Sequence, residues 1–278
     1  MLSSRAPVFS LAVRLVQKTL WGGAVAAVLA GCASTDVQTP TNDPMYNTSV
    51  DAERLRLAQT RVQLGAMHFS EGRYDIALGE VAQALQAHPN YADAYNLRGW
   101  IYLSQRDYLK ADASFDRALS IRPGDPDTRY NLGWSQCQQK NFERAHMHFD
   151  AALVDGRYPD AGRARTLLAK AVCLRDEGKT DQVLPVLTQA YELDPGNPAI
   201  GLNYSRALME SGDLQRARFY IRRLNNSEFA SAASLWLGMR IDHKLGDSLA
   251  VRQQGNQLIQ RFPTSRERDL YEQGAWNE

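Results

Sequence analysis

Small and apolar residues recur along the chain with a fixed spacing of 34 positions, and Gly65, Gly99 and Gly133 keep this spacing. Two series of alanines and one pair of prolines keep it as well: Ala77, Ala111 and Ala145; Ala84, Ala118 and Ala152; Pro89 and Pro123. The stretches EGRYDIALGEVAQALQAHPN and SQRDYLKADASFDRALSIRPG align in their aromatic residue, alanines, leucine and proline. A period of this length indicates an array of repeated supersecondary units.

Each unit has the pattern of a helix, a tight turn and a second helix. The glycine and the alanines let the two helices, and then the next unit, approach closely. The proline near the end of a unit stops the second helix, because proline lacks an N–H group and clashes with the preceding turn. We find no convincing strand pattern and therefore predict an all-α fold. These positions resemble the tetratricopeptide repeat, whose units of about 34 residues stack into a superhelix with a concave face, right-handed in this family.

With Ala58 as the start, the pattern predicts six repeats in a single domain: residues 58–91, 92–125, 126–163, 164–197, 198–230 and 231–264. The third is lengthened by four residues around GRYPDAG, and the fifth and sixth follow the pattern least closely. Residues 265–278 are predicted as a capping helix and tail that cover the apolar face of the last repeat.

The first 31 residues are typical of an export signal. Arg5, Arg14 and Lys18 precede the uncharged thirteen-residue segment TLWGGAVAAVLAG. This segment is shorter than the roughly 20 residues that a transmembrane helix needs. A basic start, a short apolar core and small residues before a cleavage point indicate a secretory signal peptide.

The sequence Leu29-Ala30-Gly31-Cys32 resembles the lipobox of bacterial lipoproteins. The resemblance implies that Cys32 is acylated and becomes the N-terminus of the mature chain. Ala33 after it implies sorting to the outer membrane. The alternative is an ordinary signal peptide in which Cys32 has no special role.

Residues 32–57 are predicted as the lipidated N-terminus and a flexible linker. Residues 33–51 are rich in Ser, Thr, Asn, Asp and Pro and nearly free of large apolar side chains, so they cannot bury enough surface to fold alone. A flexible chain of this length reaches about 25 Å on average. We expect the repeats to hang a short distance from a membrane.

Charge and motifs argue against catalysis and nucleic-acid binding. After the signal, 29 Lys and Arg stand against 31 Asp and Glu, which leaves no basic surplus for nucleic acid. We find no phosphate loop, Gly-x-Ser-x-Gly elbow or His-Glu-x-x-His motif. His146 and His148 would point about 200° apart on a helix and could not share a metal. We predict no catalytic residue, metal, cofactor or small-molecule substrate.

Two further cysteines, Cys137 and Cys173, fall on the first helices of successive repeats and are 36 residues apart. An exported chain meets an oxidising compartment, which favours a disulfide between them. Such a bridge would stabilise the fold by about 2–4 kcal/mol. The alternative is a pair of buried free thiols that pack as small apolar residues.

In tetratricopeptide proteins the concave face is lined by five positions of each first helix. Here those positions hold Val62, Phe69, Asn96, Trp100, Leu103, Tyr130, Trp134, Arg165, Arg175, Arg206 and Met209. Tryptophan and arginine are enriched among interface anchors, so these residues are our candidate protein-binding groove. The apolar first half and cationic second half favour a bound peptide or helix. The alternative is that the aromatic residues only pack between repeats.

A narrower resemblance follows from several stretches: YADAYNLRGWIYL, YNLGWSQCQ, ARFYIRRLN, LWLGMRIDHKLGD and YEQGAWNE. Together with the lipobox and the six repeats, they resemble the type IV pilus biogenesis and stability lipoproteins, the PilF/PilW pilotin family. The match covers nearly all of the mature chain, and both cysteines fall where that family places them.

The resemblance implies a non-catalytic lipoprotein anchored in the inner leaflet of the outer membrane, facing the periplasm. It also implies that the protein helps the pilus secretin to reach that membrane and form multimers, which supports pilus biogenesis and twitching motility. Two alternatives remain open: a scaffold for outer-membrane protein insertion, and an adaptor that recruits cell-wall hydrolases.

Overall fold

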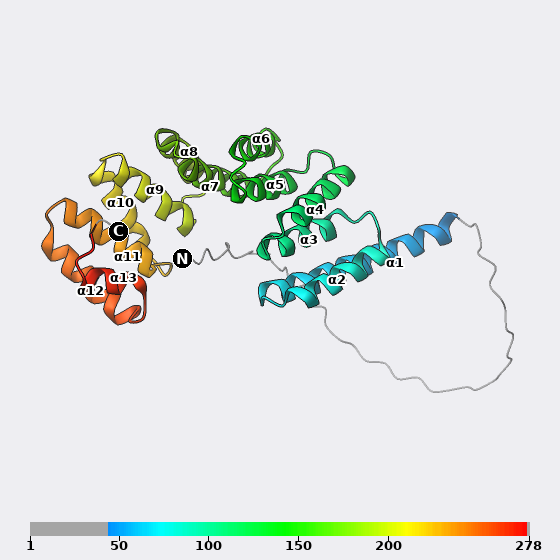
Figure 1. The fold of residues 1–278 in the computed structure, drawn as a ribbon, viewed down its shortest axis with the longest axis horizontal. Helices are drawn as coiled ribbons and strands as arrows, with labels where there is room; N and C mark the ends of the chain where they lie inside the picture. Colours follow the sequence, from blue (N-terminus) through cyan, green and yellow to red (C-terminus); the bar gives the residue numbers. More distant parts are fainter. Residues whose placement is uncertain (1–43, 277–278) are drawn as a thin grey trace, which may run out of the picture. The chain divides into compact units, whose positions relative to one another are not determined.

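The computed structural model describes residues 44–276, and every regular element in that range is an α-helix. The predicted signal peptide, Cys32 and the predicted linker up to residue 43 lie outside the described residues. The helices are α1 (Pro44–Ser70), α2 (Tyr74–Ala87), α3 (Ala92–Ser104), α4 (Tyr108–Ile121), α5 (Pro126–Gln138), α6 (Phe142–Leu153), α7 (Asp160–Glu177), α8 (Thr180–Leu193), α9 (Pro198–Glu210), α10 (Leu214–Asn225), α11 (Ala232–Lys244), α12 (Ser248–Arg261) and α13 (Arg266–Glu272) (Figure 1). None of these described helices is long and apolar enough to cross a membrane.

The helices form antiparallel pairs, α1 with α2, α5 with α6 and so on to α11 with α12. The chain divides into two compact units within α4, after Ser114. Unit 1 contains α1–α3 and the start of α4, and unit 2 contains the rest of α4 and α5–α13. The described part of the chain is therefore the all-α array of helical hairpins that the 34-residue period predicts.

The small residues of the period pack as expected. The six repeating alanines, from Ala77 to Ala152, are all fully buried. A Cβ atom at Gly133 would lie 2.8 Å from two carbon atoms of the Phe149 ring, closer than real contacts allow. The absence of a side chain at this position is thus what lets α5 and α6 approach.

The turn inside each repeat needs one residue with a left-handed backbone. Its φ is positive in all six repeats, at Gly72, Arg106, Lys140, Gly178, Gly212 and Gly246. Four of these residues are glycines, which adopt the conformation readily. Arg106 and Lys140 adopt it at φ values of 61° and 63°, which costs about 1 kcal/mol or more for a residue with a Cβ atom.

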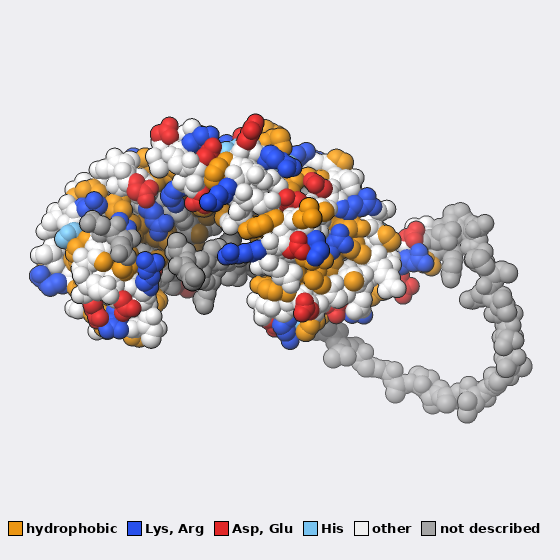
Figure 2. Space-filling view, viewed as in Figure 1, with side chains coloured by type: hydrophobic (Ala, Val, Ile, Leu, Met, Phe, Trp, Pro, Cys, Tyr) orange, Lys and Arg blue, Asp and Glu red, His pale blue; other side chains and the backbone are white. Residues whose placement is uncertain are grey.

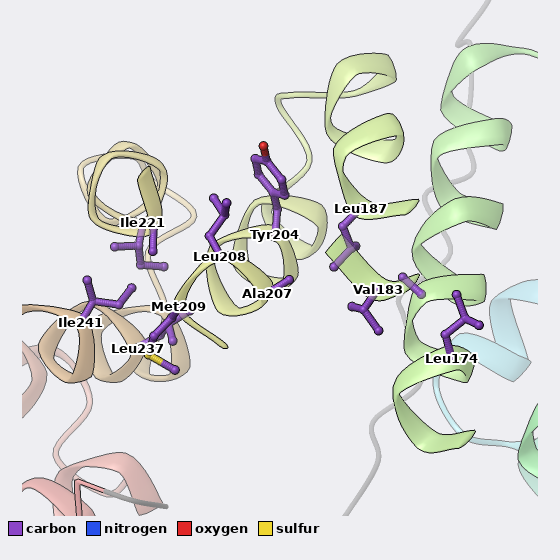
Figure 3. Close-up of a cluster of buried hydrophobic side chains, with 12 residues drawn as sticks. Leu174, Val183, Leu187, Tyr204, Ala207, Leu208, Met209, Ile221, Leu237 and Ile241 are labelled. Atoms are coloured by element: carbon purple, nitrogen blue, oxygen red, sulfur yellow. The ribbon is translucent and has the colours of Figure 1, made fainter. Parts of the chain in front are cut away.

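A continuous apolar core runs through the later helices of unit 2. Side chains from α7 to α11 meet in one cluster, which includes Leu187, Leu208, Ile221 and Ile241 (Figure 3). Each of these four is at most 1% exposed. Helices that contact mainly their chain neighbours are thereby joined into one unit.

The last repeat is covered by α13 and the residues after it. Leu270 and Tyr271 belong to the apolar cluster of α11 and α12. Trp276 stacks on Trp236 with ring centroids 5.2 Å apart, and on His243 at 4.4 Å. The predicted C-terminal cap is therefore present.

One predicted boundary is wrong. Helix α1 begins at Pro44, so residues 44–57 are helical and not the flexible linker that their composition suggested. A polar composition excludes burial, but an existing helix can be extended at little cost, and proline is favoured in the first turn. Helix α7 begins at Asp160, in the lengthened segment before the predicted repeat 164–197.

The earlier start of α7 comes from the lengthened segment before it. Tyr158 in this segment is 5% exposed, and a Cβ atom at Gly162 would lie 2.3 Å from its ring. Its hydroxyl donates to Asp127 Oδ1 at 3.0 Å. The extra residues therefore form a buried anchor and an additional helical turn.

Candidate protein-binding face

In unit 2 the odd-numbered helices α5, α7, α9 and α11 line the inner side of the curve, and α6, α8 and α10 lie on its outer side (Figure 1). The candidate groove residues after Ser114 lie on these inner helices: Tyr130 and Trp134 on α5, Arg165 and Arg175 on α7, and Arg206 and Met209 on α9. Their repeat positions thus bring them to one side of unit 2.

Several apolar candidates are too buried to serve as exposed anchors. Trp100 is 6% exposed, Leu103 7%, Tyr130 4% and Met209 7%. For these residues the structure favours the alternative that they pack within the array. Their position in the repeat is inward, but the neighbouring side chains cover them.

The remaining apolar and amide candidates are intermediate. Val62 and Phe69 are half-buried and pack against the core of unit 1, with Phe69 5.9 Å from the Tyr74 ring. Asn96 on α3 and Trp134 on α5 are also half-buried. Phe69 and Trp134 are thus the aromatic candidates that keep accessible surface.

Arg165 is held by a polar cluster at the start of α7. Its guanidinium lies over the Tyr130 ring at 4.5 Å from the centroid, and its Nη2 donates to Asp127 Oδ1 at 2.5 Å. Burial raises the pKa of Tyr130 to about 12. Arg165 on α7 therefore contacts α5 twice, through its ion pair with Asp127 and its stacking on Tyr130, and holds the two helices together.

Arg175, near the end of α7, is only partly satisfied. Its Nη1 donates to Asn203 Oδ1 at 3.1 Å, and its Nε lies 3.9 Å from Glu210 Oε2. Its Nε and Nη2 are buried without a hydrogen-bond partner. This guanidinium is therefore held between α9 residues, with two buried donors that make no hydrogen bond.

Arg206 on α9 makes no hydrogen bond or ion pair within residues 44–276. Burial is the main cause that lowers its pKa, and the charges of Arg175 and Arg240 lower it further, while Glu210 opposes the shift. Arg175 and Glu210 are thus both electrostatic neighbours of Arg206 and lie 3.9 Å apart.

Two features of unit 2 were missed from the sequence. Arg240 on α11 was not among the candidates, although its distance of 34 residues from Arg206 equals the repeat period. The second feature is a cavity of about 200 Å³ beside α8 and α10, lined in part by Tyr191, Tyr220 and Phe229. No spacing rule connects the residues of this cavity.

Charge and apolar surface are distributed differently in the two units. In Figure 2 hydrophobic side chains gather over the region of α3 and α4 in unit 1, where Leu109 is 84% exposed. On the visible face of unit 2, Lys and Arg side chains are scattered among other residue types.

Cys137 on α5 and Cys173 on α7 form a disulfide, with Cα atoms 5.8 Å apart. The two cysteines are 4% and 0% exposed. The bridge ties the first helices of two successive repeats, as the oxidising-compartment argument predicted. In the part of the chain that the structure describes, no group of three His, Cys, Asp or Glu side chains could hold a metal ion.

Comparisons with known protein families and solved structures also indicate tetratricopeptide repeats. A tetratricopeptide-repeat family profile matches residues 64–126, and a second one matches residues 174–236. A comparison with curated proteins found no match.

Three solved structures resemble this one. PilF of Pseudomonas aeruginosa has a TM-score of 0.69 and 22% identity, over 80% of this chain and 99% of that chain. PilW, a widely conserved type IV pilus biogenesis factor, has a TM-score of 0.67 and 28% identity, over 76% of this chain and 96% of that chain. YrrB, a tetratricopeptide-repeat protein with an unusual peptide-binding site, has a TM-score of 0.53 and 16% identity, over 69% of this chain and 97% of that chain.

Proposed function

We propose, from the premise that this chain is a tetratricopeptide-repeat protein with PilF and PilW among its structural neighbours, that it acts in type IV pilus biogenesis as a non-catalytic scaffold. The likeness to PilW carries the proposal, because it extends over 76% of this chain and 96% of PilW at 28% identity. A shared fold alone does not imply a shared function. The length of the match and the quoted sequence stretches support this function over a general repeat scaffold.

The finer proposal is a pilotin. The protein would be anchored by acylated Cys32 on the periplasmic face of the outer membrane, and would promote the localisation and multimerisation of the pilus secretin. The lipobox supports the anchor. The disulfide between Cys137 and Cys173 supports export, because disulfides persist in oxidising compartments. The repeat array supports a protein partner, since such arrays bind along extended faces.

The test is to delete the gene, fractionate the cell envelope, and follow the location and heat-resistant multimers of the secretin. The same assay is run with Cys32→Ala. Loss or mislocalisation of multimers in both strains would support the pilotin and its anchor. Loss in the deletion alone would keep the assembly role without the lipid. Normal multimers in both would overturn the proposal and favour the insertion-scaffold or hydrolase-adaptor alternative.

A further inference from the structure

The cavity of about 200 Å³ in unit 2 lies at the end of α8, beside the start of α9 and the last turns of α10. Its lining is mostly apolar and includes Tyr191, Pro195, Pro198, Tyr220, Leu224 and Phe229. Sites for small molecules usually start at about 300 Å³. The volume of this cavity therefore suits one side chain of a partner better than a separate ligand.

Aromatic rings form one wall of the cavity. The rings of Tyr191 and Tyr220 meet edge to face, with centroids 5.0 Å apart. Tyr204, which is 2% exposed, lies at 5.0 Å from both rings and supports them. Phe229 also lines the cavity and is 54% exposed. Rings held in this way suit another aromatic ring, because aromatic side chains prefer edge-to-face or offset-stacked contacts with one another.

Gly201 on α9 keeps the cavity open. This glycine is buried and belongs to the lining, yet a Cβ atom at its position would meet no neighbouring atom within 4 Å. Glycine inside a helix is less favourable than alanine. No close helix contact requires it here, unlike at Gly133, where a Cβ atom would lie 2.8 Å from the Phe149 ring. The missing side chain of Gly201 therefore leaves space to the cavity.

Arg223 is the charged residue of the cavity lining, and its side chain is exposed. Its Nη1 donates to the Tyr191 hydroxyl at 3.3 Å, which places the guanidinium beside the aromatic wall. Within residues 44–276 it forms no ion pair, whereas the other three arginines of α10 each pair with an aspartate. A guanidinium has five N–H donors in a planar fork that matches a carboxylate. Arg223 can therefore bind a carboxylate from outside the chain.

We propose that this cavity binds an aromatic side chain of a partner protein, next to an Asp or Glu residue whose carboxylate pairs with Arg223. The inference rests on the proposed function only in that the partner is a protein. The ring fills the space beside Gly201 and contacts Tyr191 and Tyr220. The carboxylate accepts from the donors of Arg223 that Tyr191 leaves unused. An aliphatic or uncharged segment would satisfy only half of this site.

Two substitutions separate the aromatic half of the site from the ionic half. Gly201→Leu should weaken binding by roughly tenfold or more, because it fills the anchor pocket. It should not lower the unfolding temperature, since the space is open and leucine favours a helix. Gly79→Leu on α2 is the control, because a Cβ atom there also meets no neighbour within 4 Å.

Arg223→Gln should weaken binding of an acidic peptide by roughly two- to fivefold, as expected for an exposed ion pair. Binding of a neutral peptide should not change. Arg252→Gln is the control, because it removes the same charge from an exposed site on α12.

The experiment titrates the full chain, purified in detergent, by saturation-transfer NMR, with detergent alone as the blank. The probes are the capped peptide Gly-Glu-Phe-Glu-Gly, its analogues with Ala for Phe or with Gln for both Glu, and capped hexaproline. We expect the first peptide to bind, the Ala analogue to bind at least tenfold more weakly, and the Gln analogue to bind two- to fivefold more weakly, as estimated for an exposed ion pair at about 0.2–1 kcal/mol. With Arg223→Gln the acidic peptide and its Gln analogue should bind equally.

The proposal is overturned if the acidic aromatic peptide does not bind, if Gly201→Leu binds it as well as the wild-type chain, or if Arg223→Gln weakens both peptides equally. Tighter binding of hexaproline would assign the cavity to a proline-rich segment and overturn it too. So would a dimer, seen by sedimentation, that Gly201→Leu abolishes, because the occupant would then be a second copy of this chain.

The secretin assay on the deletion strain does not depend on these titrations. The cavity can therefore fail as a binding site while the pilotin role stands, and the reverse.

Discussion

The second and third repeats differ from the later repeats in what they place on equivalent positions. Helices α3 and α5 carry Trp100, Leu103 and Tyr130, all less than 10% exposed. Helices α7, α9 and α11 carry Arg175, Arg206 and Arg240, all partly exposed. The turns of these repeats differ as well. Arg106 and Lys140 take the left-handed conformation in the second and third repeats, whereas glycines take it in the later repeats.

This comparison shows that a residue at a predicted groove position is not necessarily a binding residue. An apolar side chain there can be drawn into the packing between helices, where burial stabilises it. An arginine at such a position keeps its charged head near solvent. Trp100, Leu103 and Tyr130 are therefore packing residues, whereas Arg175, Arg206 and Arg240 keep part of their surface exposed.

The strongest test of this contrast is Trp100→Ala, measured by chemical unfolding. We expect the free energy of unfolding to fall by about 3–5 kcal/mol, as for other buried large-to-small substitutions. Leu109→Ala is the control, because this leucine is 84% exposed and its loss should change stability little. A stable Trp100→Ala variant that no longer captures its partner would show that Trp100 is a binding residue after all.

The next test concerns the disulfide that joins α5 to α7. The double substitution of Cys137 and Cys173 by alanine should reduce the free energy of unfolding by about 2–4 kcal/mol. A reducing agent should lower the stability of the wild-type chain by a similar amount and leave the double variant unchanged. An unchanged wild-type chain under reduction would contradict the prediction.

A pH test distinguishes buried from exposed groups on α5. Burial raises the pKa of Tyr130 in the folded chain to about 12. As the pH rises, this tyrosine therefore ionises in the unfolded chain before it ionises in the folded one. Its contribution to stability is complete below pH 10 and is lost as the pH rises toward 12. We expect the wild-type chain to lose up to about 2–3 kcal/mol more than Tyr130→Phe over this range. Equal losses in the two proteins would place Tyr130 in contact with solvent.

The smallest expected effect is at the turns. Lys140→Gly should raise the free energy of unfolding by up to about 1 kcal/mol, because glycine removes the left-handed strain. Lys140→Ala keeps the Cβ atom and removes the charge, so it should not stabilise. Gly178→Ala should act in the opposite direction, since its φ is 88°. A gain with Lys140→Ala would attribute the effect to charge.

Much of the fold could be predicted from the sequence, because the small residues that recur every 34 positions mark where helices must pack closely. The six alanines had to be small and buried, and they are. The extension of α1 to Pro44 could not be predicted, because linker composition reports on burial and not on helix continuation. The depth of Trp100 could not be predicted either, since its surroundings depend on side chains far away in the sequence.

The site was predicted in part. Arg175 and Arg206 followed from their repeat positions, but Arg240 falls in the degenerate sixth repeat and was overlooked. The electrostatic effect of Arg175 and Arg240 on Arg206 appears only when α7, α9 and α11 are placed in space. The disulfide followed from compartment chemistry together with the side-by-side arrangement of first helices.

The C-terminal cap has a consequence for how copies of this chain can associate. An uncovered last repeat would offer its apolar end to the first repeat of another molecule, and such head-to-tail contacts produce open filaments. Here Leu270, Tyr271 and Trp276 occupy that end. The cap therefore covers apolar side chains of α11 and α12 that a second molecule could otherwise contact.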